Sequence, residues 1–221
     1  MKEVAAGLFQ LKGFPPNGIN VYLAEDVVID AASRHGSGRI LSQVAARYPA
    51  ALALTHGHAD HQGSASAVCG ALQIPLWCPE GEAEAVESGD VLSLTPNNQM
   101  AVLSASSFAG PGHPVARRLK EGDEVAGFKV LNTPGHSPGH VAYWRESDRT
   151  LILGDVLCNM NLLTGITGLH EPPRVFTVDV ARNRESARRL AQLEPLCVCF
   201  GHGPPLRDTK KLIDFVEALP R

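Results

Sequence analysis

The sequence has no large excess of one charge, no even set of cysteines and no long apolar run near its start, the features typical of nucleic-acid-binding, disulfide-rich secreted and membrane proteins respectively. The 221 residues carry 20 basic and 23 acidic side chains, a net charge of −3, whereas nucleic-acid binding requires clustered Lys and Arg. Five cysteines, an odd number, do not match the disulfide framework of a small secreted protein. Residues 1–16 lack the apolar run of a signal peptide or membrane span. We therefore expect a cytoplasmic protein with no nucleic-acid partner and no membrane segment.

Glycine and proline are abundant, at 21 and 16 residues, and divide the chain into short elements. Apolar runs bounded by turn residues predict strands at 8–11, 19–23, 27–31, 50–54, 75–78, 125–131, 140–144, 151–153 and 196–200. Helical spacing predicts helices at 39–48, 60–69, 79–87, 181–193 and 209–219. Residues 88–114 are expected to form a surface excursion or a lid made of a strand pair. No linker interrupts this order, so residues 1–221 are predicted to form one domain with layered sheets and outer helices.

Four side chains that can bind metals fall within six positions directly after the predicted strand 50–54: His56, His58, Asp60 and His61. Residues two apart in an extended turn point the same way, so His56 and His58 can share one ion. Asp60 and His61 begin the next predicted helix and can face a second ion. The spacing therefore predicts two neighbouring metal ions.

Three further candidate ligands, His136, Asp155 and His202, follow the ends of other predicted strands in glycine-flanked loops. Such loops present functional groups from a rigid scaffold, and glycine lets the backbone approach a metal cluster. Seven His and Asp ligands without cysteine favour a catalytic site over a structural one. We expect two divalent ions, zinc first, although this ligand set also accepts iron or manganese.

These residues resemble the signature of the metallo-β-lactamase-fold hydrolases, His-x-His-x-Asp-His followed by a His, an Asp and a His. The loops Thr133–His136, Gly139–His140 and Gly154–Asp155 are similar to those of the glyoxalase II-like group. The resemblance implies an αββα four-layer sandwich, in which two mixed β-sheets pack face to face with helices outside. It also implies the ligand sets: His56, His58 and His136 for the first metal, Asp60, His61 and His202 for the second, Asp155 bridging both. His140 and Asp30 match positions that support these ligands.

The expected chemistry is hydrolysis by a hydroxide that bridges the two metals, since metal binding lowers the pKa of water to about 7. Asp60 is the candidate catalytic residue, orienting this hydroxide and accepting its proton. The expected substrate is a small acyl compound, a thioester, ester or lactone. The segments expected to wall its pocket contain one cation, Arg174, and offer Phe14, Asn159, Leu162, Leu163 and His170.

Two alternatives remain open at the level of the sequence. One is a persulfide dioxygenase of the same fold with a single iron ion, and the other is a metal-dependent ligand-binding module. Homo-oligomer formation also remains open. Away from the metal-binding residues, His35 and His113 are expected on the surface, Cys158, Cys197 and Cys199 are expected to be buried, and the arginines of 182–189 are expected to face water.

Overall fold

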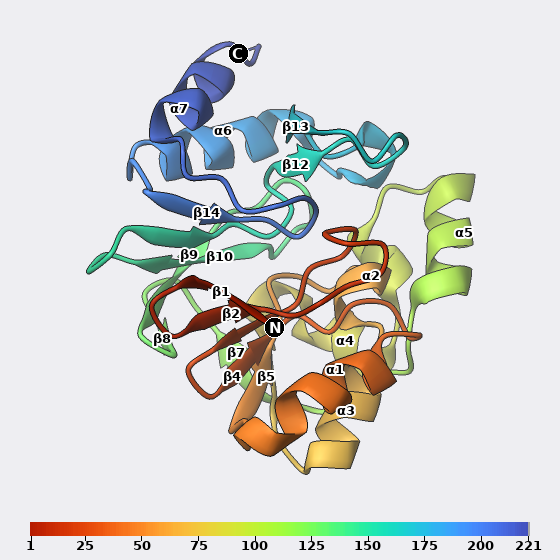
Figure 1. Ribbon diagram of the computed structural model, residues 1–221. Helices are drawn as coiled ribbons and strands as arrows, with labels where there is room; N and C mark the ends of the chain where they lie inside the picture. The colour runs from red at the N-terminus through yellow and green to blue at the C-terminus, as the bar shows by residue number, and fades with distance from the viewer. Residues whose placement is uncertain (221) are drawn as a thin grey trace.

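The computed structural model describes residues 1–220 and stacks helices, a sheet, a second sheet and further helices in four layers (Figure 1). The first sheet has seven strands in chain order: β1 (Lys2–Ala5), β2 (Leu8–Gln10), β3 (Tyr22–Ala24), β4 (Val27–Ile29), β5 (Ala51–Ala53), β6 (Leu76–Pro79) and β7 (Val115–Leu119). The second has five, in the order β14 (Cys197–Cys199), β11 (Thr150–Ile152), β10 (Val141–Arg145), β9 (Phe128–Asn132) and β8 (Glu124–Val125).

Both sheets are mixed. Strands β1 to β4 pair antiparallel and β4 to β7 pair parallel. In the second sheet only β11 and β14 pair parallel. The expected αββα sandwich of two mixed sheets is therefore confirmed. A separate two-stranded ribbon joins β12 (Cys158–Met160) and β13 (Thr167–His170), which the strand patterns did not predict.

The alternation of side chains along the strands produces three apolar cores, one between each pair of layers. In β4, Val27 and Ile29 face the second sheet, whereas Val28 faces the outer helices. The first sheet is covered by α1 (Ser37–Val44), followed by η1 (Ala45–Arg47), and by α3 (Ala65–Leu72). The second sheet is covered by α6 (Val180–Ala191) and α7 (Thr209–Glu217), with Leu190 and Leu212 in the core beneath them.

The predicted helix 60–69 is interrupted. It forms α2 (Ala59–Gln62) and α3, separated by Gly63 and Ser64. A Cβ atom on Gly63 would lie 2.4 Å from backbone atoms of Arg34 and of Phe108, so three chain segments meet here too closely for a side chain. The predicted helix 79–87 likewise begins with a 3-10 turn, η2 (Glu80–Glu82), before α4 (Ala83–Ser88).

Residues 88–114 were expected to form a surface excursion or a lid made of a strand pair; the segment lies at the surface, but the strand pair is wrong. This segment contains the 3-10 turn η3 (Val91–Leu94) and the helix α5 (Gln99–Phe108), which stands to one side of the four layers (Figure 1). The Asn98 side chain caps α5 by accepting a hydrogen bond from the Ala101 N–H. Only Ala101 of this helix is buried, so its sequence lacks the periodicity of a core-facing helix.

The sequence led us to expect that the arginines of α6 all face water, and this is wrong for Arg184. Arg184 is 9% exposed and binds Glu171 through two hydrogen bonds of 2.6 and 2.9 Å, whereas Arg182 is exposed. His35 is exposed, His113 is half-buried, and the cysteines Cys158, Cys197 and Cys199 are buried. Within residues 1–220, no helix has the length and apolar character that a membrane span requires.

Candidate metal centre

The candidate ligands gather where strands of both sheets end at one edge of the sandwich. His56, His58, Asp60 and His61 follow β5, and the other three come from the loops after β9, β11 and β14. Three groups have ligand atoms within 4.8 Å of one another: His56, His58 and His136; His56, His61 and Asp155; Asp60, His61 and His202. The structure thus brings together all seven residues that the sequence put forward.

Each of the five candidate ligand histidines uses one ring nitrogen in a hydrogen bond and leaves the other toward the cluster. The Nδ1 atoms of His56, His61, His136 and His202 contact Thr55 Oγ1, Asp30 Oδ2, Thr177 Oγ1 and the Gly18 carbonyl at 3.0, 2.9, 3.2 and 2.5 Å. His58 is reversed, since its Nε2 atom lies 3.0 Å from the Leu94 carbonyl. Such contacts select the tautomer that leaves the facing nitrogen unprotonated for a metal.

Unpaired buried atoms provide a further test of whether a metal fits. Within residues 1–220, the Nε2 atoms of His56, His61 and His136 and the Oδ1 atom of Asp155 are buried without a hydrogen-bond partner. Buried polar atoms are rarely left unpaired, so such a set in one place suits metal coordination. The donors present therefore fit a site for divalent metals.

His140 differs from its neighbours because both of its ring nitrogens are already used. Its Nδ1 atom contacts Thr133 Oγ1 at 2.8 Å, and its Nε2 atom accepts the Asp155 N–H at 3.1 Å. Burial lowers the pKa of His140 to about 3, so the ring is neutral and able to accept that hydrogen bond. His140 is thus placed to orient Asp155 rather than to bind a metal.

Asp30 supports the cluster from the end of β4. Its Oδ1 atom accepts the Thr55 N–H at 2.7 Å, and its Oδ2 atom accepts the Thr55 hydroxyl at 2.9 Å and contacts His61 Nδ1 at 2.9 Å. Because Thr55 in turn contacts His56, one buried carboxylate orients two of the histidines. Thr55 and Thr177 were not identified from the sequence, where nothing but the position of Thr55 beside His56 pointed to them.

Asp155 occupies the middle of the cluster. Its Oδ2 atom lies 3.5, 3.6 and 3.1 Å from the Nε2 atoms of His61, His136 and His202. Asp60 lies nearer the opening, with its side chain 24% exposed against 6% for Asp155 and its Oδ2 atom 3.3 Å from His202 Nε2.

The protonation states follow from burial and from these charges. Burial lowers the pKa of His56 and of His136 well below the usual range. Burial also opposes charge on Asp60, His61 and His202, but their neighbours outweigh it. The imidazoles lower the pKa of Asp60. The carboxylates, Asp155 first, raise the pKa of His61 and of His202. Metal binding at Asp60, His61 and His202 must therefore displace protons from the two histidines.

The N-terminal loop secures the last of the candidate ligands. The Asn20 side chain donates hydrogen bonds to the carbonyls of Phe200 and Gly203 at 2.9 and 2.7 Å, and the Tyr22 hydroxyl donates to the Phe200 carbonyl at 2.8 Å. His202 lies between these anchor points and contacts the Gly18 carbonyl. The loop at 17–20 thus holds His202 in place, although the two segments are 184 residues apart in sequence.

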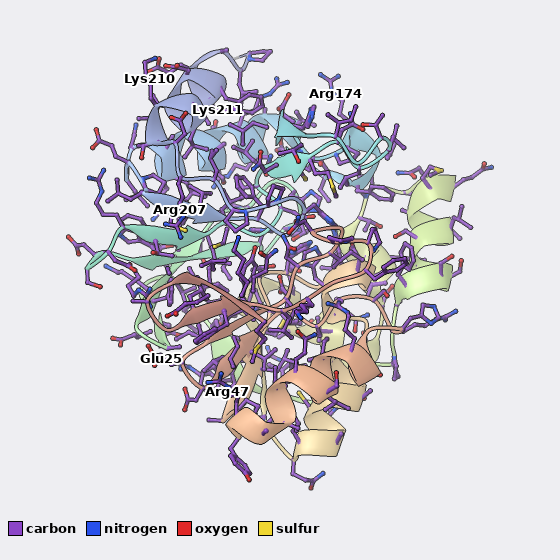
Figure 2. All side chains as sticks on the ribbon, viewed as in Figure 1. Glu25, Arg47, Arg174, Arg207, Lys210 and Lys211 are labelled. Atoms are coloured by element: carbon purple, nitrogen blue, oxygen red, sulfur yellow. The ribbon has the colours of Figure 1, made fainter. Side chains whose placement is uncertain are left out.

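A cavity of about 820 Å³ opens above the cluster, with His58, Asp60, His136, Asp155 and His202 among its lining residues. Its walls come from the N-terminal loop, from α5 and from the turn after β12, and they include Phe14, Met100, Leu103, Leu162 and Leu163. Within residues 1–220, no lysine or arginine lines it. Arg174 is exposed and lies at the outer edge of the molecule (Figure 2).

The expected pocket residues fare unevenly. Phe14, Leu162 and Leu163 line the cavity, whereas Asn159 and His170 are not among the residues that do. Asn159 is buried and donates a hydrogen bond to the Pro204 carbonyl at 2.8 Å, and His170 pairs with Cys158 in the β12–β13 ribbon. The sequence missed the contribution of α5, because that segment was not predicted to be a helix.

Comparison with known proteins agrees with this geometry. The model of the metallo-beta-lactamase superfamily matches residues 14–202, so the chain belongs to that superfamily. A probable metallo-hydrolase, YybB of Bacillus subtilis (strain 168), is 30% identical over 199 residues, which are 90% of this chain and 83% of YybB.

Two other similarities bear on substrate and metal. A hydroxyacylglutathione hydrolase of Bdellovibrio bacteriovorus is 29% identical over 155 residues, 68% of this chain and 47% of that protein. The crystal structure of TTHA1623 in a di-iron-bound form has a TM-score of 0.63 and 31% identity, covering 86% of this chain and 89% of that one. The chain is thus similar to metallo-hydrolases, including glyoxalase II-type enzymes, and to a protein whose structure contains two iron ions.

Proposed function

We propose that this protein is a dinuclear metal hydrolase that cleaves neutral, largely apolar acyl compounds: esters, thioesters or lactones. The observation that carries the proposal is the placement of the seven candidate ligands at the base of a cavity with no lysine or arginine among its described lining residues. The relatives named metallo-hydrolases support the reaction class, and the hydroxyacylglutathione hydrolase supports an acyl substrate.

In this proposal His56, His58 and His136 hold the first metal, Asp60, His61 and His202 hold the second, and Asp155 bridges them. The free ring nitrogens and the central position of the Asp155 carboxylate support this division. Zinc is the proposed metal, and the di-iron-bound relative makes iron the first competitor. When bound, the metals supply Lewis-acid polarisation of the substrate carbonyl and lower the pKa of a water.

The side chains of the site divide the remaining work. The Asp60 carboxylate lines the cavity and is the more exposed of the two acids, so it is placed to orient the attacking water and hold its proton. Asp30 and His140 keep their partners aligned and touch no substrate. Since the neighbouring imidazoles lower its pKa, the Asp60 carboxylate is ionised at neutral pH and can accept a hydrogen bond from that water.

The residues that line the cavity support the proposed substrate class. Helix α5 contains no charged residue, and its Met100 and Leu103 are 50% and 59% exposed beside the cavity. Phe14 and Leu163, 93% and 97% exposed, face the same opening. Burying these apolar groups against an apolar acyl chain is favourable, whereas the described lining residues include no lysine or arginine to pair with a polyanionic substrate.

The test combines metal analysis with a substrate panel. The purified protein is expected to contain two metal ions per chain and to show a higher kcat/KM for neutral acyl thioesters and lactones than for S-lactoylglutathione or a phosphodiester. His136→Ala serves as the inactive control. A preference for either anionic substrate would refute the proposed substrate class. One iron ion per chain, with oxygen uptake on a persulfide, would instead support the dioxygenase.

A further inference from the structure

Glu82 is a buried carboxylate that the proposed chemistry does not use. It ends the turn η2 and is 1% exposed. Its neighbours Glu80 and Glu87 pair with Lys120 and Arg118 near the surface. Glu82 makes no such ion pair within residues 1–220, so its charge is stabilised by other contacts.

Those contacts are three hydrogen bonds to two loops. Oε2 accepts the Gly57 N–H at 2.5 Å, and Oε1 accepts the Gly139 N–H at 2.9 Å and the Ser137 hydroxyl. Burying a carboxylate without a cation is costly unless such donors compensate for the lost water. The carboxylate therefore joins the two loops to each other through its two oxygen atoms.

The position of these loops gives the contacts their meaning. Gly57 lies between His56 and His58, and Ser137 directly follows His136. The two segments that Glu82 joins thus carry all three members of the three-histidine group, although β5 and β9 belong to different sheets. None of the three hydrogen bonds reaches a residue of the Asp60, His61 and His202 group.

Tight packing leaves the carboxylate little freedom. A Cβ atom on Gly139 would lie 2.7 Å from Glu82 Cγ, and one on Gly57 would lie 2.6 Å from Leu94 Cδ1. Leu94 also accepts the hydrogen bond of His58. The segment from η2 to η3 therefore orients the three-histidine group from behind, with Glu82 at one end and Leu94 at the other.

We propose that Glu82 is a positioning residue for the three-histidine group. Its loss weakens metal binding at that group and not at the group of Asp60, His61 and His202. This inference rests on the two metal sites of the proposed function. Outer partners of metal ligands typically change affinity by about 10- to 100-fold when they are removed. The same range is expected here.

Glu82→Gln is the direct test because it keeps the shape and removes one acceptor. Whichever way the amide is turned, its NH2 group faces the buried N–H of Gly57 or of Gly139, so one loop is displaced. The matched control is Glu84→Gln, since Glu84 is exposed on α4. Ser137→Ala, which removes one hydroxyl contact, provides a milder second variant should Glu82→Gln fail to fold.

Competition between the protein and a chromophoric chelator for Zn²⁺ measures the result in two single-site backgrounds. In His202→Ala, where the three-histidine group binds the remaining ion, Glu82→Gln should weaken binding by about 10- to 100-fold. In His136→Ala, Glu82→Gln should leave the affinity of the remaining ion within about twofold. Ser137→Ala should show the same selectivity with a smaller loss, and Glu84→Gln no loss in either background.

Equal weakening in both backgrounds, or none in His202→Ala, would overturn the role of Glu82 while leaving the two-metal proposal intact. The proposed metal sites themselves would be overturned if the wild-type protein bound fewer than two Zn²⁺ ions. They would also be overturned if neither His202→Ala nor His136→Ala bound fewer Zn²⁺ ions than the wild-type protein.

Discussion

Asp30→Asn is expected to weaken metal binding although Asp30 is not one of the seven candidate ligands, because Asp30 orients His61. Asp30 has a φ of +63°, a left-handed conformation that asparagine tolerates well among residues other than glycine. The substitution therefore adds little backbone strain and retains side-chain volume. What changes is hydrogen bonding, because one carboxylate oxygen becomes an NH2 group.

The consequences follow from the three donors that Asp30 accepts. With the amide oxygen on the Thr55 N–H, now 2.7 Å away, the new NH2 group faces Thr55 Oγ1 and His61 Nδ1. The His61 ring then accepts at Nδ1 and carries its proton on Nε2, the nitrogen proposed to bind the second metal. The opposite orientation leaves the buried Thr55 N–H unpaired, at a cost of about 1–3 kcal/mol.

We expect the affinity for the second Zn²⁺ to fall by about 10- to 100-fold and the metal-free protein to lose about 1–3 kcal/mol of unfolding free energy. At about 2–4 °C per kcal/mol for a chain of this size, thermal unfolding reports the stability loss and chelator competition the affinity. Asp26→Asn, at an exposed position before β4, is the matched control. Wild-type Zn²⁺ affinity in Asp30→Asn would refute the proposed orientation of His61.

Three further predictions use other parts of the site. Asp60→Asn should lower kcat by about 100-fold or more and total metal content far less; full activity with both metals present would exclude proton transfer by Asp60. Because burial lowers the pKa of His140 to about 3, the unfolded chain binds a proton at this residue at a higher pH than the folded protein does. The unfolding free energy is therefore undiminished by His140 above about pH 6.5 and falls as the pH drops from there toward 3. His140→Gln should therefore remove about 2 kcal/mol of the drop in metal-free unfolding free energy between pH 7 and pH 5, measured in urea; an unchanged drop would contradict a neutral, buried His140. Leu103→Glu should lower kcat/KM for an apolar acyl thioester about tenfold at constant metal content, since covering this half-exposed side chain contributes about 1.4 kcal/mol; equal kcat/KM would remove α5 from substrate binding.

The local pattern of the chain determined where the candidate ligands lie. His56, His58, Asp60 and His61 are adjacent in sequence, and His136, Asp155 and His202 each follow a buried strand. Strands that end at the same edge of a sandwich bring such residues together without any other information. For the same reason the alternation of apolar residues was sufficient to locate most strands of both sheets and the helices that cover them.

Other features depended on contacts between distant segments. Glu80, Glu82 and Glu84 are equivalent in sequence, yet only Glu82 is buried, because Gly57, Ser137 and Gly139 lie against it. Which ring nitrogen of each histidine is free likewise depends on partners as remote as Gly18 and Thr177.

Helix α5 illustrates the limit most clearly. Hydrophobic periodicity reports a helix through the face that it buries, and α5 buries only Ala101 against the protein. The apolar residues of α5 that line the cavity do not pack against the core, so their spacing does not show the periodicity of a core-facing helix. The sequence by itself thus determined the chemistry of the candidate metal centre, while only the tertiary structure decided which side chains orient it and which apolar surface surrounds its entrance.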